Sequence, residues 1–258
     1  MNRRSRRGVA LVLVLWIVVI LAGVSAGVVR SARTSTGIAA NARTTTIARA
    51  AAESGIEAIV AAIEDTLARF DNSDDRKDWL NALALQSNPD SFSLGDGRFQ
   101  VAVVDVSARL DVNAATLPAL QAFFSQFTDP AGAAAIANAI RQRIDSGATH
   151  DPGATFRPRS ATLIRSLDEL HQRRLVPEAI LARAAPYLTV DGDGAINART
   201  ASDTVLVAAS GELRDEPSRL LLISRGWVSG HPLTSEIQAV YAISGNRLVF
   251  SHWRERSL

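Results

Sequence analysis

Residues 9–29 read VALVLVLWIVVILAGVSAGVV, a stretch that contains no charged residue and no proline. As a helix with about 1.5 Å of rise per residue, this stretch would reach roughly 31 Å, which is close to the hydrocarbon thickness of a bilayer. A helix buried in a protein core would normally be shorter and carry a polar stripe. We therefore predict a transmembrane helix over residues 9–29.

The segment before this stretch is strongly basic. It reads Met1-Asn-Arg-Arg-Ser-Arg-Arg-Gly8, and its positive charges are Arg3, Arg4, Arg6 and Arg7. Arginines beside an apolar helix keep that end of the helix in the cytoplasm. A cleaved secretory signal would have a shorter apolar region followed by an Ala-x-Ala-like site. Here the small residue stands before the apolar stretch, which indicates a different kind of leader.

A basic leader that ends in glycine directly before an apolar helix resembles the prepilin leader of type IV pilins and type II secretion pseudopilins. The resemblance implies that a prepilin peptidase cleaves between Gly8 and Val9, and that the new N-terminus at Val9 is methylated. An uncleaved single-pass anchor is the alternative.

The fifth position after the proposed cleavage site departs from the common pilin pattern. Most pilins carry glutamate there, which in that family neutralises the N-terminal ammonium of a neighbouring subunit, whereas this chain has Leu13. A carboxylate in lipid is costly, and a subunit with no neighbour ahead of it gains nothing from one. Leu13 therefore suits the first subunit of a filament, and it equally suits a chain that is not a pilin.

Helical character continues beyond the apolar stretch. Apolar residues recur at steps of three and four along the following segment: Ile56, Ile59, Val60, Ile63 and Leu67. This spacing is typical of an amphipathic helix. We predict one helix from Val9 to about Ala68, with its second half packed on the sheet of a soluble domain.

Four glycines lie within this predicted helix. Gly23 and Gly27 form a small-xxx-small pair, which permits close contact between helices in lipid. Gly37 and Gly55 argue against an unbroken helix, because glycine is a poor helix former.

The soluble part begins with an acidic segment and continues with β-prone runs. We expect a polar loop over Asp71–Asp78 and a short helix over Trp79–Leu85. Two runs on either side of Gly95-Asp96-Gly97 predict a β-hairpin, because Asp-Gly between β-prone runs is a strong turn signal. The predicted strands are Ser91–Leu94 and Arg98–Asp105, and then, as a C-terminal antiparallel meander, Leu220–Val228, Thr234–Ile243 and Arg247–Trp253.

An internal repeat brackets a helical segment. Residues 111–120 are echoed by residues 195–206, with Asn113 and Thr116 matching Asn197 and Thr200. We expect each asparagine to bond the local backbone and each threonine to cap the following helix. The predicted helices between the copies are 117–127, 130–144, 166–171 and 177–187. They form an all-α insertion over residues 111–190.

This order of parts, which ends in Trp253-Arg-Glu255, resembles the K subunit of type II secretion, a minor pseudopilin. The resemblance implies an α+β fold: a long N-terminal helix packed on an antiparallel sheet, with a large all-α insertion. The expected parts are a leader (1–8), the transmembrane (9–29) and periplasmic (30–70) parts of the long helix, a pseudopilin core (71–110 and 191–258) and the insertion (111–190).

The same resemblance implies where the chain acts and with what. It implies a single-pass protein of the inner membrane with its C-terminal domain in the periplasm. It further implies a tip complex with the I and J minor pseudopilins, contacts with other pseudopilins, and a structural role in export across the outer membrane. The bulky insertion would block further subunits from stacking above it.

Other functions are disfavoured by what the sequence lacks. It contains no recognisable hydrolase, zinc-protease or phosphate-loop motif, and His150, His171, His231 and His252 are scattered without ligand spacing. We therefore expect no enzymatic activity. The chain has no cysteine, which excludes disulfides and thiolate metal sites.

One short loop leaves a metal site open. Asp191 and Asp193 alternate in a loop, as carboxylates do in calcium loops, but the downstream glutamate of an EF-hand is missing. Some members of the K family bind calcium. A plain turn is favoured here, no cofactor is certain, and Ca²⁺ stays open.

Two further alternatives use the same leader and helices. A minor pilin of a type IV pilus shares the leader and the long helix. A membrane-anchored helix-hairpin-helix nucleic-acid binder would share the paired short helices, but the helix turns here lack its Gly-x-Gly. Moreover, the formal net charge of +2 includes four leader arginines, so the mature chain would be net acidic and a poor match for phosphate. We therefore expect no nucleic-acid partner.

Overall fold

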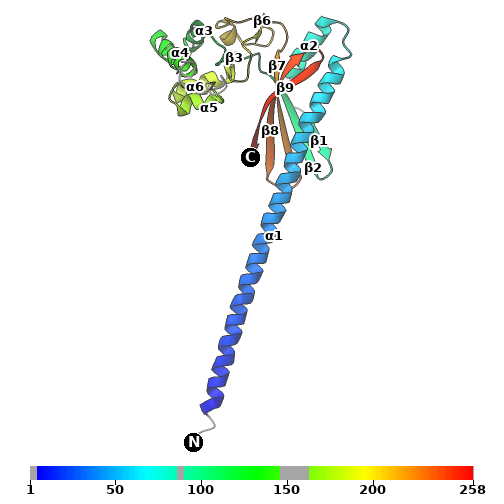
Figure 1. The fold of residues 1–258 in the computed structure, drawn as a ribbon, viewed down its shortest axis with the longest axis vertical. Coiled ribbons are helices and arrows are strands. Elements are labelled where there is room, and N and C mark those ends of the chain that lie inside the picture. The colour runs from blue at the N-terminus through cyan, green and yellow to red at the C-terminus, as the bar shows by residue number, and fades with distance from the viewer. Residues whose placement is uncertain (1–4, 86–89, 146–162, 258) are drawn as a thin grey trace, which may run out of the picture.

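The structure is a computed structural model that describes the backbone of residues 5–85, 90–145 and 163–257. Its longest element is helix α1 (Ser5–Leu67), which forms one unbroken rod whose first half projects from the rest of the chain (Figure 1). This agrees with the helix predicted from Val9 to about Ala68. Within α1 the side chains of residues 14–25, 30, 31 and 33–67 are described.

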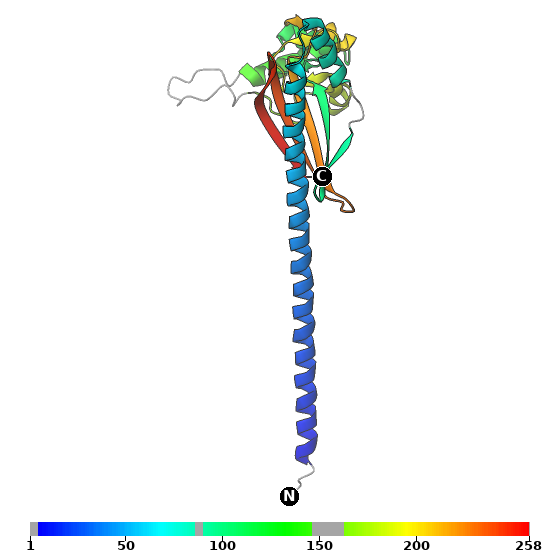
Figure 2. The ribbon, with the colours of Figure 1, turned by 90° about the vertical axis from the view of Figure 1, so that its right-hand side faces the viewer.

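A five-stranded antiparallel sheet packs against the second half of α1 (Figure 2). Its strand order is β1 (Ser91–Leu94), β2 (Gly97–Asp105), β7 (Arg219–Val228), β8 (Thr234–Ser244) and β9 (Arg247–Ser257). Alternate residues of β2 are buried, as expected for a strand with one face on a core. The core between helix and sheet includes Ala52, Ile63 and Leu67 of α1 with Leu220 and Leu222 of β7. The predicted hairpin and meander are confirmed.

The first hairpin turns one residue earlier than its Asp-Gly pair suggests. Leu94 pairs with Gly97, so Gly95 and Asp96 form the two-residue turn and Gly97 belongs to β2. Gly95 has a φ of 57°, a conformation that glycine adopts without steric cost.

Glycines also explain how closely α1 lies on the sheet. A Cβ atom at Gly226 of β7 would overlap the backbone of α1 at Ala48 and Ala52. A Cβ atom at Gly55 of α1 would overlap the side chain of Ser224. α1 continues through Gly55, whose missing side chain gives β7 room to approach.

Helix α2 (Ser73–Ala84) corrects the prediction of a polar loop over Asp71–Asp78. The side chain of Asn72 accepts a hydrogen bond from the backbone N–H of Asp74 at 3.0 Å and caps the helix. Asp74 and Asp75 lie in the first turn, where negative charge stabilises a helix N-terminus. The acidic run is thus a helix start rather than a loop.

Residues 106–218, here called the lobe, connect the neighbouring strands β2 and β7. In its described residues, 106–145 and 163–218, the lobe contains four helices of six residues or more, the 3₁₀ helix η2 (Ala185–Tyr187), the short helix α7 (Asp203–Leu206) and two parallel strand pairs. The longer helices are α3 (Leu117–Phe124), α4 (Pro130–Asp145), α5 (Leu167–Gln172) and α6 (Glu178–Ala184). The strand pairs are β3 (Leu110–Asp111) with β4 (Leu188–Thr189), and β5 (Ile196–Asn197) with β6 (Leu213–Arg214). The predicted helices of the insertion are therefore present. The prediction that residues 111–190 are all-α is wrong, because Asp111 of β3 pairs with Thr189 of β4 and closes the insertion with a short parallel strand pair.

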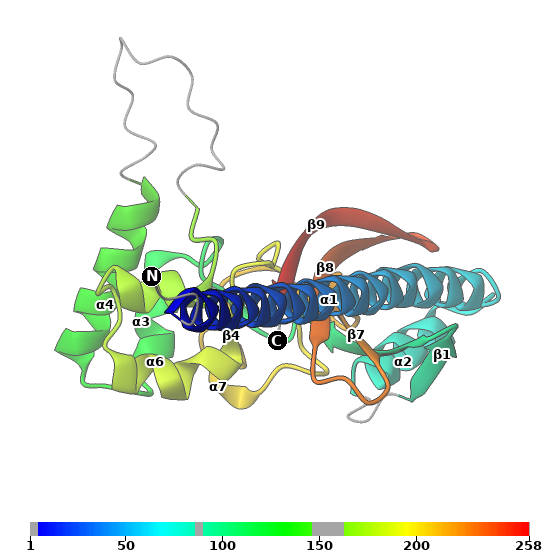
Figure 3. The ribbon, with the colours of Figure 1, turned by 90° about the horizontal axis from the view of Figure 1, so that it is seen from below.

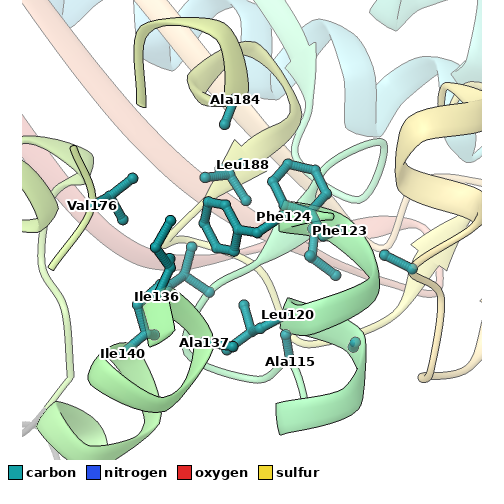
Figure 4. Close-up of a cluster of buried hydrophobic side chains, with 14 of the residues drawn as sticks. Ala115, Leu120, Phe123, Phe124, Ile136, Ala137, Ile140, Val176, Ala184 and Leu188 are labelled. Atoms are coloured by element: carbon teal, nitrogen blue, oxygen red, sulfur yellow. The ribbon is translucent and has the colours of Figure 1, made fainter. Parts of the chain in front are cut away.

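The lobe has a hydrophobic core of its own (Figure 4). Phe123 and Phe124 of α3 are fully buried, with Ile140 of α4 packed in the same cluster. The cluster also includes Val205 and Ala208, which follow the predicted end of the insertion at residue 190. The lobe lies beside the end of the sheet that is far from the N-terminus of α1, at the level of α2 (Figures 1 and 2).

Candidate functional site

The projecting half of α1 exposes large apolar side chains over residues 14–24. Its described large apolar side chains are about half to two-thirds exposed, with Trp16 at 63% and Leu21 at 59%. The first buried side chain of α1 in the described part is Thr44, at 6%. A surface of this size needs a cover of lipid or protein.

Most leader and assembly residues predicted from the sequence lie outside the described parts. This holds for Arg3 and Arg4 altogether, and for the side chains of Arg6, Arg7, Val9 and Leu13. Gly8 lies within α1, and Gly27 lies within a part of α1 whose side chains are not described. Gly23 has open space around the position of a Cβ atom, as a helix-contact site would. These predictions stay predictions.

The membrane span also stays a prediction. Among the residues whose side chains are described, no helix offers an apolar stretch long enough to cross a bilayer. Of the predicted span, residues 14–25 belong to that described part.

A buried polar network joins the lobe to the sheet and to α2. The side chain of Asn197 is completely buried, and its Nδ2 donates to Oδ2 of Asp105 at 2.7 Å and to Oδ1 of Asn81 at 2.8 Å. The hydroxyl of Thr200 donates to the same Asp105 oxygen at 2.6 Å. Asp105 ends β2, Asn81 lies on α2 and Asn197 ends β5, so this network fixes three separate elements at one point.

The two copies of the repeat use their shared residues differently. Thr116 caps α3 by accepting from the N–H of Ala119 at 3.3 Å, as predicted. Thr200 does not cap α7, whose N-cap is Ser202, so that part of the prediction is wrong. The side chain of Asn197 accepts from the nearby N–H of Arg199 at 3.1 Å.

Asn113 connects parts of the lobe that are distant in sequence. Its Nδ2 donates to the carbonyls of Ile164 at 3.0 Å and Val190 at 3.3 Å. Its Oδ1 accepts from the N–H of Ile164 at 2.9 Å. The expected bond to local backbone is therefore replaced, at this copy, by a tie across the lobe.

Asp191 forms a second link between the lobe and the sheet. Its side chain is 8% exposed, and it accepts from Nη2 of Arg254 at 2.6 Å and contacts Nε2 of His252 at 3.0 Å. Both partners lie on β9. Asp193 accepts from the hydroxyl of Ser218 at 3.0 Å and from the N–H of Ala195 at 3.1 Å.

These contacts bear on the open calcium site. Both loop carboxylates already accept hydrogen bonds from protein donors, and Asp191 faces two basic side chains. Within the described residues no group of three or more metal-ligating side chains is found. Calcium binding by Asp191 and Asp193 therefore stays a prediction without support from their arrangement.

We call the region where the lobe contacts the sheet and α2 the junction. Among its acids, Asp111 has the largest change in pKa. It lines a cavity of about 280 Å³ between the two copies of the repeat and is 6% exposed. Burial raises its pKa to about 6, although the backbone N–H groups of Asn113 and Ala114 act in the opposite direction. Burial likewise lowers the pKa of Arg109, which faces Asp105 and Asp191. The junction therefore holds buried charged side chains close to one another.

Sequence reasoning had not singled out Asp105, Asn81 and His252 as contact residues. The sequence predicts that Asp105 ends a strand and that Asn81 lies in a short helix. Their signal was weak: each is one polar residue in or beside an amphipathic element, where a solvent-facing position is the ordinary reading.

Comparison with known proteins bears on the fold. No protein-family model and no curated protein matches the sequence. Among solved structures, the chain is similar to a subunit in the crystal structure of the GspK–GspI–GspJ complex from the type 2 secretion system of enterotoxigenic Escherichia coli. The TM-score is 0.59 at 15% sequence identity, over 87% of this chain and 99% of that chain. The predicted resemblance to the K subunit is thus confirmed at the level of the fold, and the chain has the architecture of a subunit of that complex.

Proposed function

We propose that this chain is a minor pseudopilin of a type II secretion system. It assembles with the I and J minor pseudopilins at the tip of the pseudopilus and has a structural role in export across the outer membrane. The observation that carries this proposal is one arrangement: a projecting apolar helix, a sheet packed on its second half, and a lobe at the far end. That arrangement matches nearly the whole length of a subunit of the GspK–GspI–GspJ complex.

The exposed apolar side chains on the projecting half of α1 support its transfer from the membrane to the filament. In the inner membrane its exposed apolar side chains contact lipid, and in the filament they contact the helices of neighbouring subunits. Cleavage between Gly8 and Val9, with methylation of Val9, prepares the helix for this transfer. Leu13 agrees with a subunit that has no neighbour ahead of it.

The lobe supports the tip position. It lies beside the end of the sheet that is opposite the projecting part of α1 (Figure 1). A subunit stacked above would have to occupy the same space. The chain therefore caps a filament and does not extend it.

The direct test is co-purification from membranes. The full-length chain is expressed with the I-like and J-like minor pseudopilins encoded in the same genome, extracted in mild detergent and isolated through an affinity tag. We expect both partners in the complex. Selective isolation of type IV pilins would instead support a pilus subunit, and DNA retention that falls with salt would support the nucleic-acid alternative.

A variant that lacks the lobe tests the role of the lobe. The N–H of Val106 donates to the carbonyl of Arg219 at 3.1 Å, so these residues lie side by side. Replacing residues 107–218 with an Asn-Gly turn would join β2 and β7 as a simple hairpin. We expect the variant to enter the membrane and be processed but to form no tip complex. Normal secretion by this variant would refute the role given to the lobe.

A further inference from the structure

A cleft separates the lobe from the face of the sheet that is turned away from α1. Figures 1 and 3 show the helices of the lobe on one side of the strands and the second half of α1 on the other. The cleft has a volume of about 380 Å³, within the range of about 300–1,000 Å³ that is usual for ligand pockets. We call it the arginine cleft, because Arg109 of the lobe and Arg254 and Arg256 of β9 line it.

The floor of the arginine cleft is apolar. Successive side chains of a strand point to opposite faces of the sheet, and Val103 and Leu222 belong to the core that includes α1. Val104, Leu221 and Ile223 therefore point the other way, and they line the cleft. All three are only partly buried. An apolar group of a ligand would thus cover surface that the chain leaves open to water.

Arg109 is a half-buried cation without a bonded partner. Within residues 5–85, 90–145 and 163–257, its guanidinium forms no hydrogen bond and no ion pair. Asp105 and Asp191 act on it electrostatically, but both carboxylates already accept hydrogen bonds from other side chains. Burial lowers the pKa of Arg109, so its charge is poorly solvated. An anion from outside the chain would supply the acceptor that its five N–H donors lack.

The two arginines of β9 extend the positive charge to the edge of the sheet. Arg254 pairs with Asp191 at 2.6 Å. Arg256 is exposed, and in the described part of the chain its guanidinium bonds no carboxylate. The acids that line the cleft are Asp191 and the exposed Asp168. Three arginines against two acids give this lining a net charge of +1, which favours an acidic ligand.

The lining also distinguishes between classes of acidic ligand. Single-stranded nucleic acid is usually held by aromatic side chains that stack on its bases, and no aromatic side chain is among the described residues that line the cleft. A carboxylate can accept two parallel hydrogen bonds from one guanidinium. An extended peptide in which acidic and apolar residues alternate presents its carboxylates on one side and its apolar groups on the other. Such a peptide matches both the arginines and the apolar floor.

We propose that the arginine cleft binds an extended segment of a partner protein in which acidic and apolar residues alternate. Carboxylates of the segment pair with Arg109 and Arg256. An apolar side chain of the segment lies on the floor formed by Val104, Leu221 and Ile223. The bound segment contacts both the lobe and the sheet, so it also holds the lobe in its orientation. This inference goes beyond the proposed function and does not depend on it, because it rests on the lining of the cleft.

Peptide binding to the full-length chain tests the proposal. The chain is placed in lipid nanodiscs, and the probe is a fluorescein-labelled hexapeptide with blocked ends in which glutamate and leucine alternate. One control peptide carries glutamine in place of glutamate, the other carries serine in place of leucine, and empty nanodiscs give the background. Fluorescence anisotropy measures the dissociation constants. We expect each control peptide to bind about tenfold more weakly or worse.

Three arginine variants locate the charge that binds the peptide. Arg247→Gln is the matched control for Arg256→Gln, because Arg247 is an exposed arginine of the same strand outside the cleft. We expect affinity for the acidic peptide to fall about tenfold or more in Arg109→Gln, about threefold in Arg256→Gln and less than about twofold in Arg247→Gln. Without peptide, Arg109→Gln should unfold at the same or a higher temperature, because it removes a half-buried charge that lacks a partner. A purely structural role of Arg109 predicts a lower temperature.

A photoreactive form of the acidic peptide identifies where it binds. A diazirine analogue replaces its leucines, and the crosslinked residues are found by mass spectrometry. We expect products at Val104, Leu221 or Ile223. Products confined to α1 would overturn the proposal, because they would show binding to the exposed apolar half of that helix.

Three other results would also overturn it. These are equal binding of the glutamine peptide, unchanged affinity in Arg109→Gln, and no binding of the acidic peptide at about 1 mM. Displacement of the peptide by a DNA oligonucleotide at a lower concentration than by unlabelled peptide would show a nucleic-acid site instead. None of these results alters the expected co-purification with the I-like and J-like subunits, so the proposed function stands or fails separately.

Discussion

Replacing Asn197 by alanine should weaken the attachment of the lobe to the sheet and lower the stability of the fold. The change removes the donors to Asp105 at 2.7 Å and to Asn81 at 2.8 Å, and the acceptor for the N–H of Arg199 at 3.1 Å. The bond to the Asp105 carboxylate contributes about 1.5–3 kcal/mol and each of the others about 1 kcal/mol. Asp105 still accepts the hydrogen bond from Thr200, so its buried carboxylate remains partly hydrogen-bonded. We expect Asn197→Ala to lower the free energy of unfolding by about 3–4 kcal/mol.

The measurement is urea unfolding of a fragment that starts at Arg43, just before the first buried side chain of α1 at Thr44. Circular dichroism and the combined fluorescence of Trp79, Trp227 and Trp253 are followed together, and Trp79 packs against the helix–sheet core. The control is Asn138→Ala, because the Asn138 side chain is exposed and bonds only its own helix at 2.8 Å. That control should change stability by less than about 0.5 kcal/mol. Equal effects of the two variants would refute the account of the junction.

Three further predictions follow from other features. Burial raises the pKa of Asp111 from 3.8 to about 6, so protonated Asp111 stabilises the fold fully below pH 3.8, and this stabilisation is lost as the pH rises through 6. Asp111→Asn should remove up to about 3 kcal/mol of this pH dependence of the free energy of unfolding, measured by unfolding at pH 4 and 7.5. Gly226→Ala should cost at least about 3 kcal/mol, because its Cβ would overlap the α1 backbone, whereas Gly37→Ala, with open space, should be neutral or slightly stabilising. Both are measured by urea unfolding of a longer fragment that starts at Arg30. Gly8→Val should block leader removal, seen as an unchanged mass by mass spectrometry in place of the shorter mature chain.

Much of the fold could be predicted because it depends on local periodicity. The steps of three and four along α1 and the β-prone runs ending at Trp253 are short-range patterns, and they gave the helix, the hairpin and the meander. The acidic run after Phe70 was harder, because Asn72 as a helix cap and Asp74 in a first turn look like a solvated loop until the cap is identified.

The junction could not be predicted, because its contacts join residues far apart in sequence. Asn197 meets Asn81 across 116 positions, and Asp191 meets His252 across 61. The repeat pointed to Asn197 as a special residue, but only as a local one. The bulge in β9 was equally hidden, since it depends on the pairing of β8 with β9.

The placement of the lobe between two paired strands has a consequence for how the chain acquires its structure. β2 is synthesised long before β7, yet the two become neighbours from Gly97 with Val228 to Asp105 with Leu220. Holding the ends of a long open loop together is entropically costly, but a loop that has already condensed around its own core brings its ends together at little extra cost. The lobe would then fold first, as an independent nucleus, and β2 and β7 would pair only after the lobe has folded.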